Sequence, residues 1–190
     1  MKILYVVHQF LPRNVAGTEV YTYRLAKEMQ REHEVCLLFS EVEPERTQYE
    51  TEPGTFDGLP FTRMTYNYHV ERFDETWSDP AAEAVFREVL EREQPDLVHF
   101  QHLQAFGVGL PAIARAHGLP IVYTLHEYAG ICPAGGQMIL PTLERCDGPG
   151  PESWGHASGT TPSRLPRNPD CPPTESRPRR PSDGPGLSSR

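Results

Sequence analysis

The sequence has no long apolar run, and this absence limits where the chain can work. No stretch of its 190 residues approaches the roughly 20 apolar residues that a membrane-spanning helix needs. The apolar run after Lys2 is too short for the core of a signal peptide, and it is interrupted first by His8 and then by Arg13. We therefore expect no transmembrane segment and a cytoplasmic location, with peripheral contact at a membrane surface left open.

Basic residues and cysteines are also scarce. The chain has 18 Lys and Arg against 26 Asp and Glu, which gives a net charge of −8. No strongly basic face is expected, so nucleic acid is not expected as a partner. The four cysteines suit thiols or ligands better than a disulfide framework.

Glycine is missing where a dinucleotide-binding turn would need it. Gly17 is the only glycine between Val7 and Glu41, whereas that turn requires Gly-x-Gly-x-x-Gly. Glu41 is the single feature in favour of such a site. Two interpretations of Gly17 stay open. It allows a turn, or the helix that starts there offers free N–H groups to a phosphate or sugar oxygen.

The segment 149–190 lacks the residues that build a core. It holds ten of the 20 prolines and contains no Lys, Ile, Val or Phe. Such a segment cannot bury enough apolar area to offset an ordering cost of roughly 1–2 kcal/mol per residue. We predict one domain over residues 1–148 and a disordered, Pro/Arg/Ser-rich tail over 149–190. The tail is either a true linker or the product of a shifted reading frame.

The body alternates between two hydrophobic periods. Strands are predicted at 2–7, 34–39, 59–66, 97–100 and 121–125, and helices at about 18–32, 80–94 and 106–117. Ser78 and Asp79 provide a cap for the second helix, and Pro80 suits its first position. This alternation predicts an α/β fold, a Rossmann-like open parallel sheet with helices on both faces.

Polar residues come directly after three of the predicted strands, at the point where each strand ends. His8 comes after the first, Gln101 and His102 after the fourth, and His126 and Glu127 after the last. The carboxyl ends of parallel strands meet at one edge, where open sheets bind ligands. We therefore predict that these side chains converge. A metal site of three histidines, typical of a hydrolase, is the alternative, but no metal is expected because its usual carboxylate and tight spacing are missing.

Several segments, in order, resemble the family-four retaining glycosyltransferases. They are His8-Gln9-Phe10-Leu11-Pro12, Ala16-Gly17-Thr18-Glu19-Val20-Tyr21, the run from Pro95 to His102, and Leu125-His126-Glu127-Tyr128 followed by Cys132-Pro133. The resemblance implies a GT-B fold, in which two Rossmann-like domains face each other across a cleft. Residues 1–148 resemble the N-terminal, acceptor-side domain, and we expect that this chain alone lacks the donor-binding half.

The resemblance also implies roles for individual residues. His126 matches a family histidine near the transferred sugar, and Glu127 stands where Asp is more usual, so both are expected in catalysis. Substrate binding is expected at five further residues: Gly17, Thr18, His8, Gln101 and His102. No cofactor is implied. A sugar nucleotide is the co-substrate, and a hexose passes to a glycan or lipid-linked acceptor. The alternative is a non-catalytic Rossmann-like remnant or an accessory module that binds carbohydrate.

Truncation after Gly148 should leave the folding of the body unchanged. The removed segment has no periodic apolar face to pack, so the midpoint of thermal unfolding should stay within about a degree of that of the full chain. Circular dichroism melts of the two chains make the comparison. A large drop on truncation would show that Trp154 or Leu165 packs against the body.

Overall fold

The computed structural model describes residues 1–68, 77–128 and 145. Its regular elements all belong to one compact unit, Met1–Glu127. In chain order they are β1 (Lys2–Val7), α1 (Gly17–Met29), β2 (Glu34–Glu41), β3 (Thr51–Phe56), β4 (Leu59–Thr65), α2 (Pro80–Glu93), β5 (Leu97–Phe100), α3 (Leu110–Ala116) and β6 (Ile121–Tyr123). The predicted tail, and Cys132 with Cys146, lie outside the described residues.

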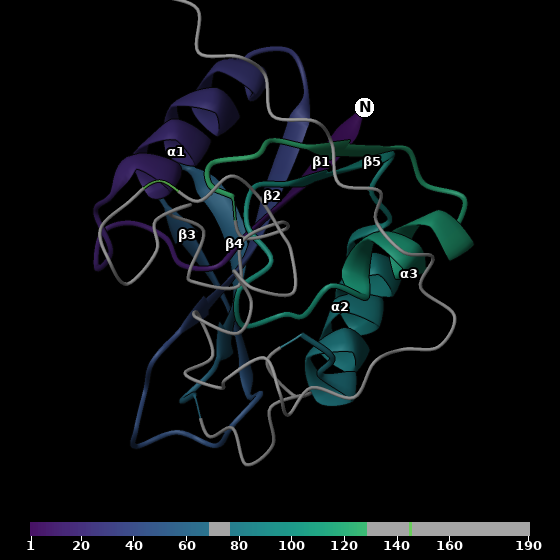
Figure 1. Ribbon diagram of the computed structural model, residues 1–190. Helices are drawn as coiled ribbons and strands as arrows, with labels where there is room; N and C mark the ends of the chain where they lie inside the picture. Colours follow the sequence, from purple (N-terminus) through teal and green to yellow (C-terminus); the bar gives the residue numbers. More distant parts are fainter. Residues whose placement is uncertain (69–76, 129–144, 146–190) are drawn as a thin grey trace, which may run out of the picture. The chain divides into compact units, whose positions relative to one another are not determined.

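The six strands form one sheet in the order β3-β4-β2-β1-β5-β6. All neighbouring pairs are parallel except β3 and β4, which are antiparallel. Helix α1 covers one face of the sheet, and α2 and α3 cover the other (Figure 1). The structure confirms the predicted Rossmann-like α/β fold. None of the helices in the described part of the chain is long and apolar enough to cross a membrane.

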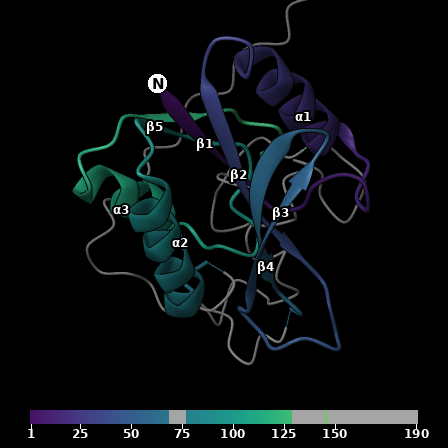
Figure 2. The same cartoon turned by 180° about the vertical axis from the view of Figure 1, so that it is seen from behind.

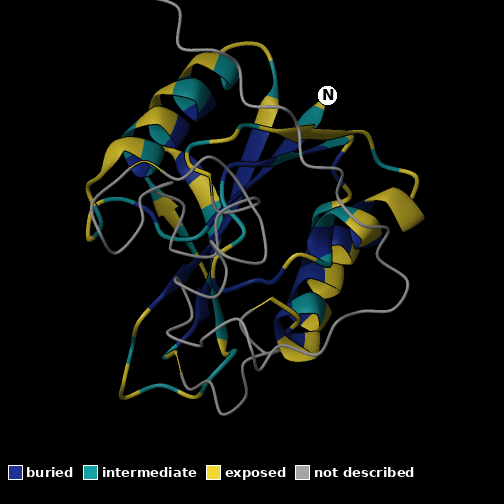
Figure 3. Cartoon of the chain, viewed as in Figure 1, coloured by how far each residue is buried: buried dark blue, intermediate teal, exposed yellow. Residues whose placement is uncertain are grey.

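Strand β1 is apolar on both faces because it divides two hydrophobic cores. Ile3, Tyr5 and Val7 belong to the core beneath α1. Leu4 and Val6 belong to the core beneath α2 and α3. Alternate side chains of a strand point to opposite faces, so a continuous apolar run is what a doubly covered strand needs. Burial is accordingly concentrated in the sheet and on the inner sides of the helices (Figure 3).

The antiparallel edge strand β3 was not predicted. Strand β4, whose loosely alternating sequence suggests an edge strand, lies between β3 and β2. The run Thr51–Phe56 contains Pro53 and Gly54, which usually indicate a loop. An edge strand tolerates proline because one side of it needs no ladder hydrogen bond. Any Cβ at Gly54 would collide with the ring of Phe61 on β4, so the two strands approach closely only at a glycine. Figure 2 shows this hairpin from behind.

Three elements differ in detail from the prediction. Helix α3 begins at Leu110 instead of about 106, since Gly107 has a φ of 80° and its N–H bonds to the carbonyl of Leu103 in a turn. The four-residue period of α1 predicts an apolar stripe of Tyr21, Leu25 and Met29 with Ala26 beside it. Ala26 is buried and Leu25 and Met29 pack against the core, whereas Tyr21 is 45% exposed. The strand predicted at 121–125, whose end should face a cleft if it is central, is shorter: β6 is the outer strand of the described sheet.

Helix α2 matches its sequence pattern closely. Its N-cap is Asp79, whose Oδ1 accepts hydrogen bonds from the N–H groups of Ala81 and Ala82 at 3.1 and 3.0 Å. Oδ2 of Asp79 also accepts a bond from the Tyr49 hydroxyl at 2.8 Å. The apolar residues that recur at i, i+3, i+4, i+7 and i+8 in its sequence predict one buried face, and all five are buried: Ala82, Val85, Phe86, Val89 and Leu90. Asp79 therefore joins the start of α2 to the segment before β3.

Replacement of Asp79 by alanine should lower the free energy of unfolding by about 2 kcal/mol, because a buried cap and a hydroxyl acceptor are lost together. Asp79→Asn keeps an oxygen for the cap and should lose less. Ser78→Ala, at the exposed neighbouring position, is the matched control and should be nearly neutral. Urea titrations of the three variants measure the difference. Equal stability of Asp79→Ala and Ser78→Ala would contradict the capping role.

Candidate functional site

The polar residues predicted to converge do meet at the carboxyl edge of the sheet. The His8 and His102 rings, beyond β1 and β5, have centroids 4.2 Å apart. His126, beyond β6, places its Nε2 2.8 Å from Oε1 of Gln101. Nε2 of His102 lies 2.7 Å from Oε1 of Glu127. Side chains from three strand ends thus form one group, which we call the histidine cluster.

His8 is paired with a buried carboxylate that the sequence did not single out. Nε2 of His8 is 3.2 Å from Oε1 of Glu19, whose side chain is only 2% exposed. The other oxygen of Glu19 accepts the N–H of Ala16 at 3.1 Å and so closes the first turn of α1. Nδ1 of His8 is buried and has no partner within the described residues. Glu19 therefore joins the start of α1 to the end of β1.

The hydrogen bonds of His102 define its tautomer. Its Nδ1 accepts the backbone N–H of Gln104 at 3.1 Å, so in the neutral ring the proton is on Nε2. That proton is donated to Glu127, whose side chain is 37% exposed. Glu127 thus lies in the cluster as predicted, and its contact there is to another side chain of the cluster.

His126 lies between a buried amide and an aromatic ring. Gln101, to which its Nε2 is bonded, is 1% exposed and lies beneath the cluster instead of at the open surface expected for a cleft-lining residue. The Tyr21 ring of α1 meets the His126 ring edge-on, with centroids 5.1 Å apart. Tyr21 is 45% exposed and lies outside the core, and its contact with His126 was not evident from the sequence pattern.

Burial and mutual repulsion keep the cluster from acquiring positive charge. Burial, with smaller effects of His102 and His126, lowers the pKa of His8 to about 4, against the opposing attraction of the Glu19 carboxylate. Burial also lowers the pKa of His126, with His102 acting in the same direction and Glu19 and Glu127 against it. Both rings are therefore neutral at pH 7.

The N-terminus of α1 is open beside this cluster. Gly17 is exposed, and a Cβ there would meet no atom within 4 Å. Its φ is outside the left-handed region, so the backbone does not require glycine, which weakens the interpretation that Gly17 only allows a turn. The N–H groups of Gly17 and Thr18 have no hydrogen-bond partner in the described part of the chain. An anion or a sugar hydroxyl has free donors there.

A hollow of about 640 Å³ adjoins this helix end. Its lining is mainly apolar and comes from the β1–α1 loop and the first two turns of α1: Val15, Ala16, Gly17, Val20, Tyr21, Arg24 and Leu25. Tyr21 belongs to both the hollow and the histidine cluster. The hollow and the cluster are therefore parts of one continuous surface.

The cluster is not arranged around a metal ion. Within residues 1–68, 77–128 and 145, no three His, Cys, Asp or Glu side chains are placed to hold one. Each histidine instead directs its Nε2 to a different partner: Glu19, Glu127 or Gln101. The hydrolase alternative therefore has no support from this geometry.

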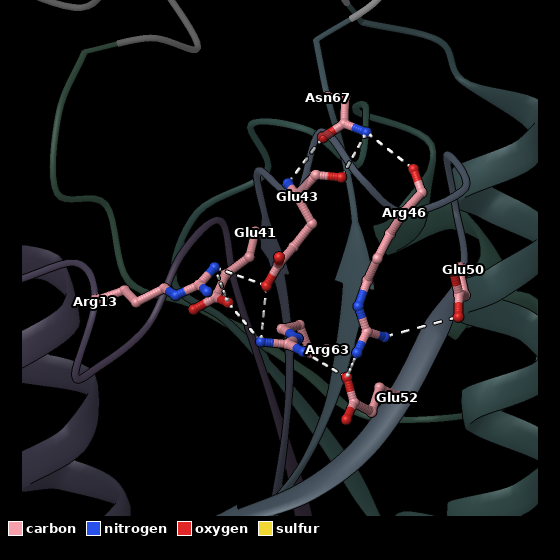
Figure 4. A network of polar contacts seen from close by, with 8 residues as sticks. All are labelled: Arg13, Glu41, Glu43, Arg46, Glu50, Glu52, Arg63 and Asn67. Atoms are coloured by element: carbon pink, nitrogen blue, oxygen red, sulfur yellow. Dashed lines mark hydrogen bonds and ion pairs between the residues drawn. The ribbon is translucent and has the colours of Figure 1, made fainter.

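A network of ion pairs occupies the other half of the same sheet edge (Figure 4). Oε2 of Glu41, at the end of β2 and only 4% exposed, is 2.9 Å from Nη1 of Arg63 and 3.4 Å from Nη1 of Arg13. Oε1 of Glu43 bridges the same two arginines at 2.7 and 3.1 Å, and Arg63 also pairs with Glu52. Glu41 is thus committed to arginines and is not free to bind a ribose.

These ion pairs hold the loop between β1 and α1 in place. Arg13 belongs to the loop that runs from His8 to α1, whereas Glu41 and Arg63 belong to the central part of the sheet. The loop is thereby attached to the ends of β2 and β4 on the side away from the histidine cluster. Among these residues the sequence points only to Glu41, because charged pairs that join distant strands have no characteristic local spacing.

Lowering the pH should destabilise the fold through these imidazoles. The pKa of His8 is about 4 in the folded chain against an ordinary 6.5, so the unfolded state binds more protons between these values and stability falls as the pH falls. The shifts of His99 and His126 have the same sign. His8 alone should contribute a loss of about 2 kcal/mol between pH 7 and pH 5.

Urea unfolding at pH 7, 6 and 5 measures this dependence. His8→Gln should flatten it, because the neutral amide replaces the group that must be kept unprotonated. His33→Gln, in the turn between α1 and β2, is the matched control and should keep the slope of the unmodified chain. A His8→Gln variant as sensitive to acid as that control would refute the assignment.

Comparison with known proteins agrees with the resemblance seen in the sequence. Residues 16–182 match a family described as "Glycosyl transferase 4-like domain". No curated protein matches the chain significantly. The matched range includes α1, the histidine cluster apart from His8, and most of the ion-pair network. The chain belongs to the glycosyl transferase 4-like domain family.

Proposed function

We propose that the histidine cluster and the open end of α1 form the acceptor side of a retaining hexosyltransferase site, in a GT-B arrangement where a second Rossmann-like domain holds the nucleotide. The hexose passes from a sugar nucleotide to a glycan or lipid-linked acceptor. The observation that carries this proposal is the convergence of His8, His102 and His126 beside free backbone N–H groups. A GT-B cleft would lie over this edge.

The chemistry of such a transfer asks for orientation more than for a strong protein nucleophile. Charge develops on a cationic sugar ring and on the leaving diphosphate, and preorganised polar groups stabilise it. A neutral imidazole at His126 donates or accepts hydrogen bonds without placing a positive charge beside the cationic sugar. Glu127 supports the site through His102, to which it is bonded. The N–H groups of Gly17 and Thr18 suit phosphate or hydroxyl oxygens.

The hollow beside α1 favours an acceptor with an apolar part. Val15 is 70% exposed and Tyr21 is 45% exposed, so both offer apolar area that a bound group would remove from water. Arg24 adds a positive charge on the same lining. An apolar wall next to a cation fits the linkage between a lipid chain and an anionic head. It supports a lipid-linked acceptor held at a membrane surface.

His126→Ala should reduce kcat for transfer by about 100-fold or more, the scale for a positioned hydrogen-bonding group. The assay combines the full chain with the nucleotide-binding domain of a two-domain family member and measures product formation from a panel of sugar nucleotides. The stability of the variant should fall by about 1–3 kcal/mol, because the buried Oε1 of Gln101 loses its partner, so kcat is taken per folded molecule. Unchanged transfer by His126→Ala would refute the proposed role.

His99→Ala is the matched control and should lower stability without lowering kcat. The His99 ring packs on Tyr5, and its Nε2 is 2.8 Å from the Thr124 hydroxyl, so its loss should destabilise the fold by about 1–3 kcal/mol, while the molecules that stay folded keep their kcat. Glycan binding without turnover, with every donor tested, would favour the alternative of a carbohydrate-binding module.

A further inference from the structure

Gln101 is a buried polar side chain whose place in the interior needs an explanation. It is 1% exposed, and its backbone N–H extends the sheet ladder to the Val6 carbonyl at 2.8 Å. Its Oε1 accepts a bond from Nε2 of His126 at 2.8 Å. Its Nε2 is buried and has no partner within the described residues. Among the described residues, the amide oxygen thus has a partner and the amide nitrogen has none.

Because Nε2 of Gln101 has no partner among the described residues, stability alone does not explain an amide at this position. A buried donor without an acceptor costs about 1–3 kcal/mol, and an apolar side chain of similar size avoids that cost. The only side-chain hydrogen bond that the structure gives Gln101 within the described residues is the bond to His126. The hydrogen bond to His126 therefore explains why an amide, and not an apolar side chain, lies at this position.

The partner of His126 differs in kind from the partners of the other two histidines in the cluster. His8 and His102 each face a carboxylate, Glu19 or Glu127, and a carboxylate favours the imidazolium form. The amide oxygen of Gln101 accepts a hydrogen bond from Nε2 of His126, and the amide carries no net charge. His126 is thus the ring in the cluster whose direct partner orients it without favouring its protonation.

We propose that Gln101 is a positioning residue that holds His126 as the neutral Nε2–H tautomer and leaves Nδ1 as a bare hydrogen-bond acceptor. Nδ1 of His126 has no partner within the described part of the chain, so none of these residues competes with a ligand hydroxyl for it. The identity of that ligand rests on the proposed function, whereas the tautomer and its cause do not.

The surroundings of His126 agree with a neutral ring. From α1 it faces the Glu19 carboxylate and the Tyr21 ring, from the end of β5 it faces His102, and from its own segment it faces Glu127. Burial and His102 lower the pKa of His126, and the two carboxylates raise it. The Gln101 amide orients His126 and adds no charge to this balance.

The experiment is imidazole nitrogen NMR on the full chain labelled with ¹⁵N-histidine, with no substrate present. Signals of His126 are assigned by their loss in His126→Gln. In the unmodified chain we expect a proton on Nε2 that exchanges slowly with water, and an unprotonated Nδ1. Gln101→Met should lose the slow exchange and broaden the tautomer equilibrium, while the thermal midpoint stays the same or rises because the unpaired amide is gone.

A second variant, Gln101→Glu, tests the same contact if Gln101→Met folds poorly. Gln101→Glu places a carboxylate at the same atom positions and should move the titration midpoint of His126 up by about one pH unit or more. Gln104→Met, on the exposed side of the same segment, is the matched control and should leave both the tautomer and the midpoint unchanged.

Three outcomes would overturn the proposal. They are a proton on Nδ1 in the unmodified chain, an unaltered His126 in Gln101→Met, and a midpoint in Gln101→Glu equal to that of the control. A loss of stability in Gln101→Met with the tautomer unchanged would assign Gln101 a packing role instead. Because none of these measurements involves a sugar, failure of the transfer assay and failure of this proposal are separate results.

Discussion

The site depends on the parallel pairing of β1 with β2 and β5. Backbone bonds continue this ladder past the strand ends: Gln101 N–H donates to the Val6 carbonyl at 2.8 Å, and Ser40 N–H donates to the His8 carbonyl at 3.1 Å. On the outer side, Thr124 N–H donates to the Phe100 carbonyl at 3.0 Å. These bonds place the residues after each strand at one level. A slip of one residue would turn alternate side chains to the other face and disperse the cluster.

Burial is the second constraint, because it decides the charge of the cluster. Two imidazole rings with centroids 4.2 Å apart would repel strongly if both were protonated. Glu19 pairs with His8 and Glu127 pairs with His102, whereas His126 is bonded to the neutral amide of Gln101. The cluster can therefore supply hydrogen bonds to a ligand without a net positive charge. This division arises from side-chain type at three positions that are far apart in the chain.

Much of the fold could be predicted because local patterns and tertiary packing agree. The continuous apolar run of β1 and the periodic face of α2 each match the burial that they experience. Prediction failed where tertiary contact overrides local preference. Strand β3 contains Pro53 and Gly54, which usually indicate a loop. It is a strand because it pairs with β4 at the edge of the sheet. Tyr21 fits an apolar stripe of α1, yet it faces His126 and not the sheet.

The sequence alone determined which residues come directly after the strands, and thereby that His8, His102 and His126 share one edge, since chain order and the parallel rule suffice for that. It did not determine what each ring touches. Glu19 lies eleven residues after His8 in the chain, and Gln101 lies 25 residues before His126, so no spacing rule joins these pairs. Only the folded sheet, with α1 packed at its edge, brings a carboxylate to one imidazole and a neutral amide to another. The hydrogen bonds that set tautomer and charge exist only at contact distance, which is why tertiary structure decided them.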